Sequence, residues 1–278
     1  MPAFPRRGRA LGSGEARSAR RSIHGAPMSD LSAFPITERW APRDPSILQL
    51  YAFPTPNGVK VSIALEETGL PYEPHLVTLK DEDVKSPEFL SLSPNNKIPA
   101  ILDPDGPGGQ PLGLFESGAI LIYLAEKTGK LGGQGAEAYA VRQWLMWQMG
   151  GLGPMFGQMG FFVKFAGSEI EDPRPRQRYV DEAKRLLGVL DRHLEGREWV
   201  AGGYSIADIA IAPWLRALGF YGAKDMVGWS EHPNAVAYLD RFLERPAVKS
   251  GLSIPEQEGE RDQEPRNVRE ASGAGISA

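Results

Sequence analysis

Short apolar runs alternate with helix-like spacing in the first half of the chain, between residues 46 and 131. Four runs are bounded by proline, glycine or asparagine and predict strands: residues 47–52, 72–79, 98–102 and 111–114. Apolar positions at helical spacing after Gly58, around 87–92 and after Ser117 predict helices. The order strand–helix–strand–helix–strand–strand–helix is typical of a thioredoxin-like α/β domain, in which the first two strands run parallel and the last two form a hairpin.

The second half, residues 137–253, is helical in its spacing and shows no convincing strand. A long helical pattern over 139–162 contains several glycines, which should bend or interrupt it. Ser205 and Asp208 have the spacing of a capping box, which predicts the start of a buried helix. The predicted fold class is therefore α/β plus all-α, with an N-terminal thioredoxin-like domain at 46–131 followed by a C-terminal all-helical domain at 137–253.

The two flanks have a different composition. Residues 1–45 and 254–278 are polar, charged and rich in proline, glycine or serine, so we expect an extended or disordered lead-in and a disordered tail. Between Met1 and Met28 there are six arginines and one acid, Glu15. This bias fits an organelle transit peptide, or a start codon placed too early with Met28 as the true first residue. We favour the second interpretation, and both give the same mature protein.

Composition narrows the classes of function. The chain has 278 residues, 41% of them hydrophobic and 24% charged, as in an ordinary globular protein. No apolar run approaches the roughly 18–20 residues of a membrane span. The formal charge of -4 argues against a nucleic-acid partner. We therefore expect a soluble, cytoplasmic protein that binds neither membranes nor nucleic acid.

The chain has no cysteine, which excludes disulfides, thiolate metal sites and a cysteine nucleophile. Its four histidines are scattered, so we expect no metal. In a redox-active thioredoxin fold the first strand ends in a C-x-x-C turn, and here that place holds Thr55-Pro56-Asn57-Gly58. Any sulfur chemistry must then come from a bound thiol. We predict Thr55 and Asn57 as the catalytic groups, because donors at a helix start favour a thiolate over a thiol of pKa about 8.5.

The neighbouring segments suit glutathione as the co-substrate that brings this thiol. Ile98-Pro99 offers a backbone partner to the cysteinyl residue, provided that the bond is cis. Ser117, with the amides of a helix start, suits the γ-glutamyl carboxylate, and Glu116 beside it suits the α-ammonium. Lys97 is placed to meet a carboxylate of the tripeptide.

Several long motifs resemble those of glutathione transferases: Thr-Pro-Asn-Gly-x-Lys-Val, Ser-Pro-Asn-Asn-Lys-Ile-Pro-Ala and Leu-Phe-Glu-Ser-Gly-Ala-Ile-Leu-x-Tyr-Leu-Ala-Glu-Lys-Thr-Gly. More narrowly, they resemble the nu class, the branch of disulfide-bond oxidoreductases and fungal nitrogen regulators, over about 48–252. The resemblance implies a homodimer with one glutathione site per subunit, which holds two glutathiones in some members. It supports the contacts given above and adds Arg178. Relatives commonly carry a glutamine shortly before Pro-Glu-Phe, where this chain has Asp83-Val84-Lys85, so Lys85 is a candidate replacement at the glycyl end.

The second substrate is less constrained. Phe161, Phe162 and Phe165 are expected to line part of a pocket between the domains, although core or dimer packing also suits such side chains. A small disulfide or an apolar or aromatic electrophile would fit that pocket. We predict thiol-disulfide exchange and disulfide reduction. The alternatives are glutathione conjugation, peroxidase activity, aryl-ether cleavage, or a non-catalytic regulator that only binds glutathione.

Overall fold

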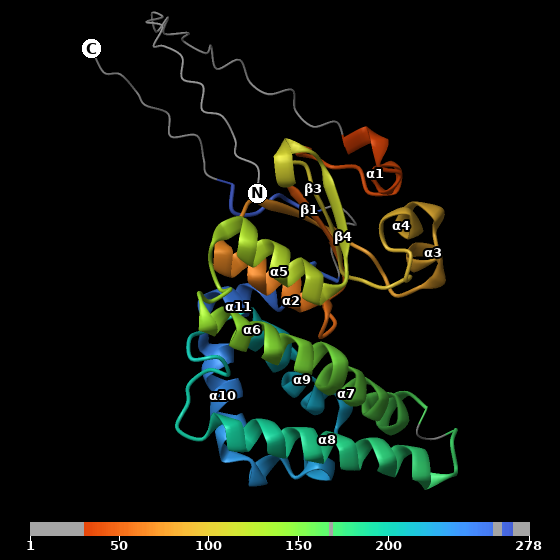
Figure 1. Cartoon of the computed structure of the whole chain (residues 1–278). Coiled ribbons are helices and arrows are strands. Elements are labelled where there is room, and N and C mark those ends of the chain that lie inside the picture. The colour runs from red at the N-terminus through yellow and green to blue at the C-terminus, as the bar shows by residue number, and fades with distance from the viewer. Residues whose placement is uncertain (1–30, 167–168, 258–262, 269–278) are drawn as a thin grey trace, which may run out of the picture.

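The computed structural model describes residues 31–166, 169–257 and 263–268 of the chain (Figure 1). The first domain contains a four-stranded sheet of order β2-β1-β3-β4. Its strands are β1 (Leu48–Ala52), β2 (Tyr72–Leu76), β3 (Ala100–Asp103) and β4 (Leu112–Phe115). β2 pairs parallel with β1, whereas β3 is antiparallel to both β1 and β4. The predicted thioredoxin-like topology is confirmed.

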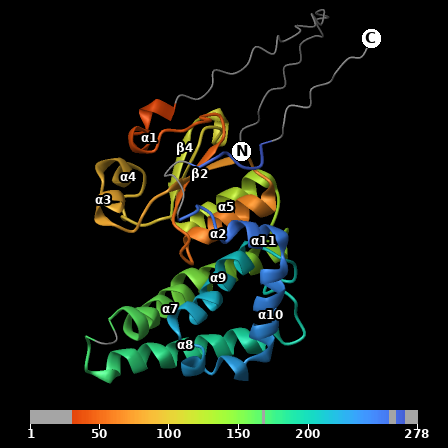
Figure 2. The same cartoon turned by 180° about the vertical axis from the view of Figure 1, so that it is seen from behind.

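Two helices, α2 (Gly58–Thr68) and α5 (Ser117–Thr128), lie side by side between the sheet and the second domain (Figures 1 and 2). The short helices α1 (Ile36–Arg39), α3 (Asp81–Val84) and α4 (Pro87–Leu92) lie on the other side of the sheet. Because α2 and α5 begin directly after β1 and β4, their N-termini lie at the edge of the sheet that faces the second domain.

The second domain is helical, as predicted. Its helices are α6 (Ala136–Trp147), α7 (Gly153–Gly160), α8 (Pro173–Leu194), α9 (Ile206–Tyr221), α10 (Pro233–Glu244) and α11 (Pro246–Gly251). The expected interruption of the long helix takes the form of π-helical turns at Gln148–Leu152 and Phe161–Phe165, on either side of α7. The predicted capping box starts the buried helix α9: the Ser205 amide donates to Asp208 Oδ2 at 2.9 Å, and Ser205 Oγ accepts from the Ala207 amide at 3.3 Å.

A continuous apolar core joins the two domains, with Ile63 of α2 and Leu215 of α9 in the same cluster. A second cluster lies on the outer face of the sheet around Trp40, Tyr51 and Phe89. Trp40 anchors it, since its indole donates to the Leu76 carbonyl at 3.0 Å. The sheet is therefore covered on both faces, and its position relative to the helical domain is set by packing.

The chain segments at the two ends of the fold differ from the extended or disordered flanks expected there. Within 31–44, Leu31, Ile36 and Trp40 are buried against the sheet face that α2 and α5 leave uncovered. In the tail, the main chain of Arg266 pairs with Tyr72 at the free edge of β2. Both segments gain order from the surface they cover, which their polar composition does not reveal. Residues 1–30 and 269–278 lie outside the described residues.

Candidate functional site

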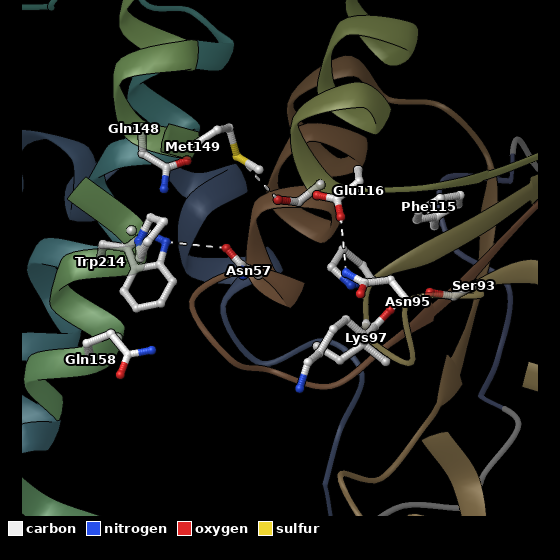
Figure 3. Close-up of a pocket in the computed structure, with 16 residues that line it drawn as sticks. Asn57, Ser93, Asn95, Lys97, Phe115, Glu116, Gln148, Met149, Gln158 and Trp214 are labelled. Carbon is white, nitrogen blue, oxygen red and sulfur yellow. Dashed lines mark hydrogen bonds between the residues drawn. The ribbon is translucent and has the colours of Figure 1, made fainter. Parts of the chain in front are cut away.

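A cleft of about 510 Å³ lies where the two domains meet. Figure 3 shows side chains from both domains facing it. The first domain contributes Asn57, Ser93, Asn95, Lys97, Ile98, Pro99, Phe115, Glu116 and Ser117, and the helical domain contributes Gln148, Met149, Gly153, Pro154, Gly157, Gln158 and Trp214. The structure thus brings together six of the seven residues predicted to bind glutathione, although they come from three separate segments of sequence.

The turn after β1 forms one end of the cleft. Asn57 lines the cleft, whereas Thr55, the other predicted catalytic residue, is two positions earlier in the chain and is not among the lining residues. Thr55 Oγ1 accepts a hydrogen bond from the Gly58 amide at 3.2 Å. A hydroxyl that accepts in this way still has its own hydrogen to donate. Gly58 is required for this turn, because a Cβ there would lie 1.8 Å from the Phe53 carbonyl oxygen. The turn therefore offers hydroxyl and amide groups at a helix N-terminus.

The start of α5 forms the opposite wall. Ser117 is the first residue of the helix, so unpaired helix amides accompany its hydroxyl. Glu116 precedes it with a φ of +73°, a conformation that costs a non-glycine residue about 1–3 kcal/mol. Its carboxylate accepts from Asn95 Nδ2 at 3.4 Å (Figure 3). An anion site and a carboxylate thus lie next to each other.

The loop before β3 connects these two ends. Ser93 Oγ donates to the Lys97 carbonyl at 2.8 Å and closes the loop. The Ile98-Pro99 bond is cis, which meets the condition set in the sequence analysis, and both residues line the cleft. Lys97 lies beside them in the cleft lining, and its side chain is exposed (Figure 3).

Beneath the site lies Lys60 of α2, which the sequence analysis did not single out. Its side chain is 0% exposed, and its ammonium donates to Gln148 Oε1 at 2.7 Å and lies 3.4 Å from Ser117 Oγ. Burial lowers its pKa from 10.5 to about 7, and the charge of Glu116 partly offsets this. One signal in the sequence could have found it: Lys60 occupies the same helical face as Ile63 and Ala64, one turn earlier.

The helical domain supplies further residues that the sequence analysis missed. Gln148 and Met149 come from the first π-helical turn, and Gln158 comes from α7. Trp214, on α9, donates from its indole nitrogen to Asn57 Oδ1 at 3.3 Å (Figure 3). No local sequence pattern marks these residues. The packing of the two domains decides which helix faces border the cleft.

Besides Thr55, four residues predicted for the site are absent from the cleft lining. Arg178 is exposed on α8, with Glu182 at 4.0 Å. Phe161 and Phe165 are 46% and 59% exposed, and Phe162 stacks on Tyr179 with ring centres 5.4 Å apart. None of the four is among the residues that line the cleft. The π-helical turn that carries the three phenylalanines directly follows α7, and the residues of α7 that border the cleft, Gly153 and Gly157 among them, all precede it.

Lys85, the candidate replacement for a glutamine, pairs with Asp81 at 2.7 Å and is also absent from the cleft lining. Within the described part of the chain, no three histidine or acidic side chains cluster as metal ligands would. No helix in that part is both long and apolar enough to cross a bilayer.

A cysteine-free thioredoxin-like domain that packs on a helical domain, with a cleft lined by both, defines a class of two-domain proteins. Models of the N-terminal and C-terminal domains of glutathione S-transferases match residues 46–126 and 173–241. The chain belongs to the glutathione S-transferase family. This confirms the resemblance seen in the motifs.

Individual relatives are similar over most of the chain. The disulfide-bond oxidoreductase YfcG of Escherichia coli is 46% identical over 209 residues, which are 74% of this chain and 94% of YfcG. A glutathione transferase from Pseudomonas putida, solved with one glutathione disulfide per subunit, is 65% identical with a TM-score of 0.80, and covers 82% of this chain and 100% of its own. One from Burkholderia graminis, solved with two glutathiones per subunit, is 62% identical with a TM-score of 0.82, and covers 85% and 100%.

Proposed function

We propose that this protein is a glutathione-dependent disulfide oxidoreductase. The observation that carries the proposal is the turn at residues 55–58, which has the place of a redox C-x-x-C turn in a chain without cysteine and places Asn57 in the lining of the shared cleft. The sulfur must then come from a ligand. The names of relatives support the same reading, since YfcG is a disulfide-bond oxidoreductase and the Pseudomonas putida structure contains glutathione disulfide.

The residues that line the cleft have complementary roles in this proposal. Ser117 and the amides of α5 bind the γ-glutamyl carboxylate, and Glu116 binds the α-ammonium. Lys97 meets a carboxylate of the tripeptide, while the backbone of Ile98 before Pro99 pairs with the cysteinyl residue. The sulfur then lies near Asn57.

The chemistry requires a thiolate, because the thiol is a poor nucleophile. The Thr55 hydroxyl and the Asn57 amide donate toward the sulfur and favour its anionic form. The thiolate attacks one sulfur of a small disulfide, so one S–S bond forms as the other breaks, and the departing thiolate takes a proton from water. A second glutathione thiolate attacks the mixed disulfide. The products are glutathione disulfide and two thiols, and the two electrons come from the two glutathiones.

Conjugation, peroxide reduction and ether cleavage would use the same thiolate on a different electrophile, and a regulator would bind glutathione without turnover. The first test is therefore glutathione-dependent reduction of a small disulfide, coupled to a glutathione reductase, on protein that starts at Met28. Turnover supports the proposal. Binding of glutathione without disulfide turnover would contradict it and favour one of the alternatives.

Matched variants separate the sulfur groups from the tripeptide contacts. Thr55→Ala should slow turnover while the dissociation constant of glutathione stays within about threefold, because a lost hydrogen bond to the sulfur affects the thiolate more than the tripeptide. Glu116→Ala should instead weaken glutathione binding by about tenfold or more, because it removes the partner of the α-ammonium. Unchanged turnover in the first variant, or unchanged affinity in the second, would remove that residue from its role.

We also propose that the protein acts as a cytoplasmic homodimer. Two exposed apolar side chains support an interface: Tyr139 and Met146 are 73% and 52% exposed on the same face of α6. Residues seven positions apart on a helix share a face, so Tyr139 and Met146 belong to one exposed apolar surface.

A further inference from the structure

The side chain of Asn57 is held by a residue of the other domain. Trp214, on α9, is 8% exposed, and its indole nitrogen lies 3.3 Å from Asn57 Oδ1 (Figure 3). The indole N–H can only donate, whereas an asparagine side chain has one accepting oxygen and one donating nitrogen. The contact therefore fixes which end of the amide faces the tryptophan: it must be the oxygen.

This orientation decides what Asn57 can offer to a ligand. With Oδ1 turned to the indole, the two N–H groups of Nδ2 are left for the cleft that Asn57 lines. Without the indole N–H, the amide could rotate and present its oxygen to the same place. A donor favours a thiolate there, while a carbonyl oxygen disfavours one. Rotation of the Asn57 side-chain amide would therefore replace a donor that favours the thiolate with an acceptor that disfavours it, and the hydrogen bond from Trp214 opposes this rotation.

Two glycines allow the Trp214 indole to lie close to the backbone of α7. Gly153 and Gly157 of α7 lie against the indole, and a Cβ at Gly153 would be 3.0 Å from its nitrogen. At Gly157 a Cβ would be 3.3 Å from the far edge of the ring. The indole therefore lies directly against the α7 backbone, which leaves it little freedom to turn away from Asn57.

We propose that Trp214 is a positioning residue, which keeps the Asn57 amide turned so that it donates to the glutathione sulfur. The proposal rests on the proposed function, because it assumes that Asn57 contacts the sulfur. It adds that the thioredoxin-like domain alone does not set the sulfur environment. The helical domain contributes through Trp214, so the sulfur site is complete only when the two domains are packed together.

Trp214→Phe tests this directly, because it keeps an aromatic ring and removes the N–H. We expect kcat for disulfide reduction to fall by about threefold to tenfold, as for the loss of one hydrogen bond, with the KM for glutathione within about threefold. The ultraviolet absorbance of the thiolate, titrated against pH with glutathione bound, should show ionisation at a higher pH. A simple packing defect would not move that titration. Trp229→Phe, outside the cleft lining, is the matched control and should change neither quantity.

A double-mutant cycle with Asn57→Ala separates the two roles, with thermal unfolding measured on each variant to confirm folding. If Trp214 acts through Asn57, Trp214→Phe should have no further effect on kcat or on the thiol titration in the Asn57→Ala background. Equal effects in both backgrounds would overturn the positioning role, as would no effect of Trp214→Phe when Asn57→Ala is strongly impaired. If Asn57→Ala itself leaves the thiol titration and kcat unchanged, the sulfur contact in the proposed function fails, and the positioning role fails with it.

Discussion

Lys60 is a fully buried cation beneath a site proposed to bind a carboxylate. Its ammonium donates to Gln148 and lies close to Ser117 Oγ, while the Ser117 hydroxyl donates to Met149 Sδ at 3.7 Å, a weak acceptor that a bound carboxylate would displace. Because burial lowers the pKa of Lys60 to about 7, both its charged and its neutral forms are populated near neutral pH. A carboxylate bound at Ser117 would favour the charged form. Protonation of Lys60 and binding of the tripeptide should therefore be coupled.

The coupling predicts that affinity falls as pH rises. Between pH 6 and 8.5 the dissociation constant of S-methylglutathione, which has no thiol to titrate, should increase by about tenfold if the ligand raises the pKa of Lys60 by about one unit. Lys60→Met should bind more weakly at pH 6 and show little dependence on pH. Calorimetry across this range measures both. Lys130→Met, outside the cleft lining, should keep the wild-type profile. A profile that persists in Lys60→Met would contradict the coupling.

Unfolding of the unliganded protein provides an independent control on the same pKa. The folded pKa, about 7, lies below the unfolded value of 10.5, so between these pH values the unfolded chain binds the additional proton. Lys60 therefore makes the unfolding free energy rise with pH through this window, by up to about 1.4 kcal/mol per pH unit, and its burial is most unfavourable below pH 7. In Lys60→Met this contribution should be absent, as urea unfolding at pH 7 and 9 would show.

Among the elements, the π-helical turn at Gln148–Leu152 does most to connect the helical domain to the site. It presents Gln148 to Lys60 and Met149 to Ser117, whose hydroxyl donates to the methionine sulfur at 3.7 Å. An additional residue in the turn shifts the helical phase, so side chains before and after it point to different faces than in a straight helix. The turn thus places Gly153 and Gly157 of α7 against the Trp214 indole.

Two alanine substitutions test this account of the turn. At Gly153 a Cβ would lie 2.3 Å from Gln148 Nε2 and 3.0 Å from the Trp214 nitrogen, so Gly153→Ala should cost about 1–3 kcal/mol of unfolding free energy and also weaken glutathione binding. Gly150→Ala is the matched control, because its Cβ would meet nothing within 4 Å. It should be neutral or stabilise the helix by up to about 1 kcal/mol. Equal unfolding curves for the two variants would show that close packing at Gly153 is unimportant.

How much the sequence could predict differs between elements. Strands and helices were predictable where the apolar spacing was clear. The capping box at Ser205 was also predictable, because it depends only on two residues three positions apart. The ordered structure around Trp40 was not predictable, because the apolar residues of this segment show no helical or strand periodicity. The burial of Trp40 is explained only by the sheet face that α2 and α5 leave uncovered. Asn57 and Ser117 were found because each sits at the start of a helix that follows a strand. Trp214 was missed because its role depends on contact between the domains.

At the scale of the whole molecule, the cleft and the proposed dimer surface lie on different elements. The cleft is bordered by α7 and α9, whereas Tyr139 and Met146 project from α6. Arg142 lies between them on the same helix, over the Tyr139 ring at 5.8 Å and 3.4 Å from Glu126 of α5. An apolar surface with charged groups at its rim is typical of a subunit interface. The proposed dimer interface can therefore be altered without changing a residue of the cleft.

Tyr139→Glu combined with Met146→Glu should convert the dimer to monomers, because carboxylates buried in an apolar interface without partners cost several kcal/mol. Light scattering should then give a mass near that of one chain, 30.4 kDa, in place of about twice that value. Phe220→Glu is the matched control, since Phe220 is an equally conspicuous exposed aromatic, 61% exposed, at the C-terminal end of α9. It should leave the mass unchanged. A monomeric wild-type protein, or a dimer that survives both α6 substitutions, would show that this face is not the interface.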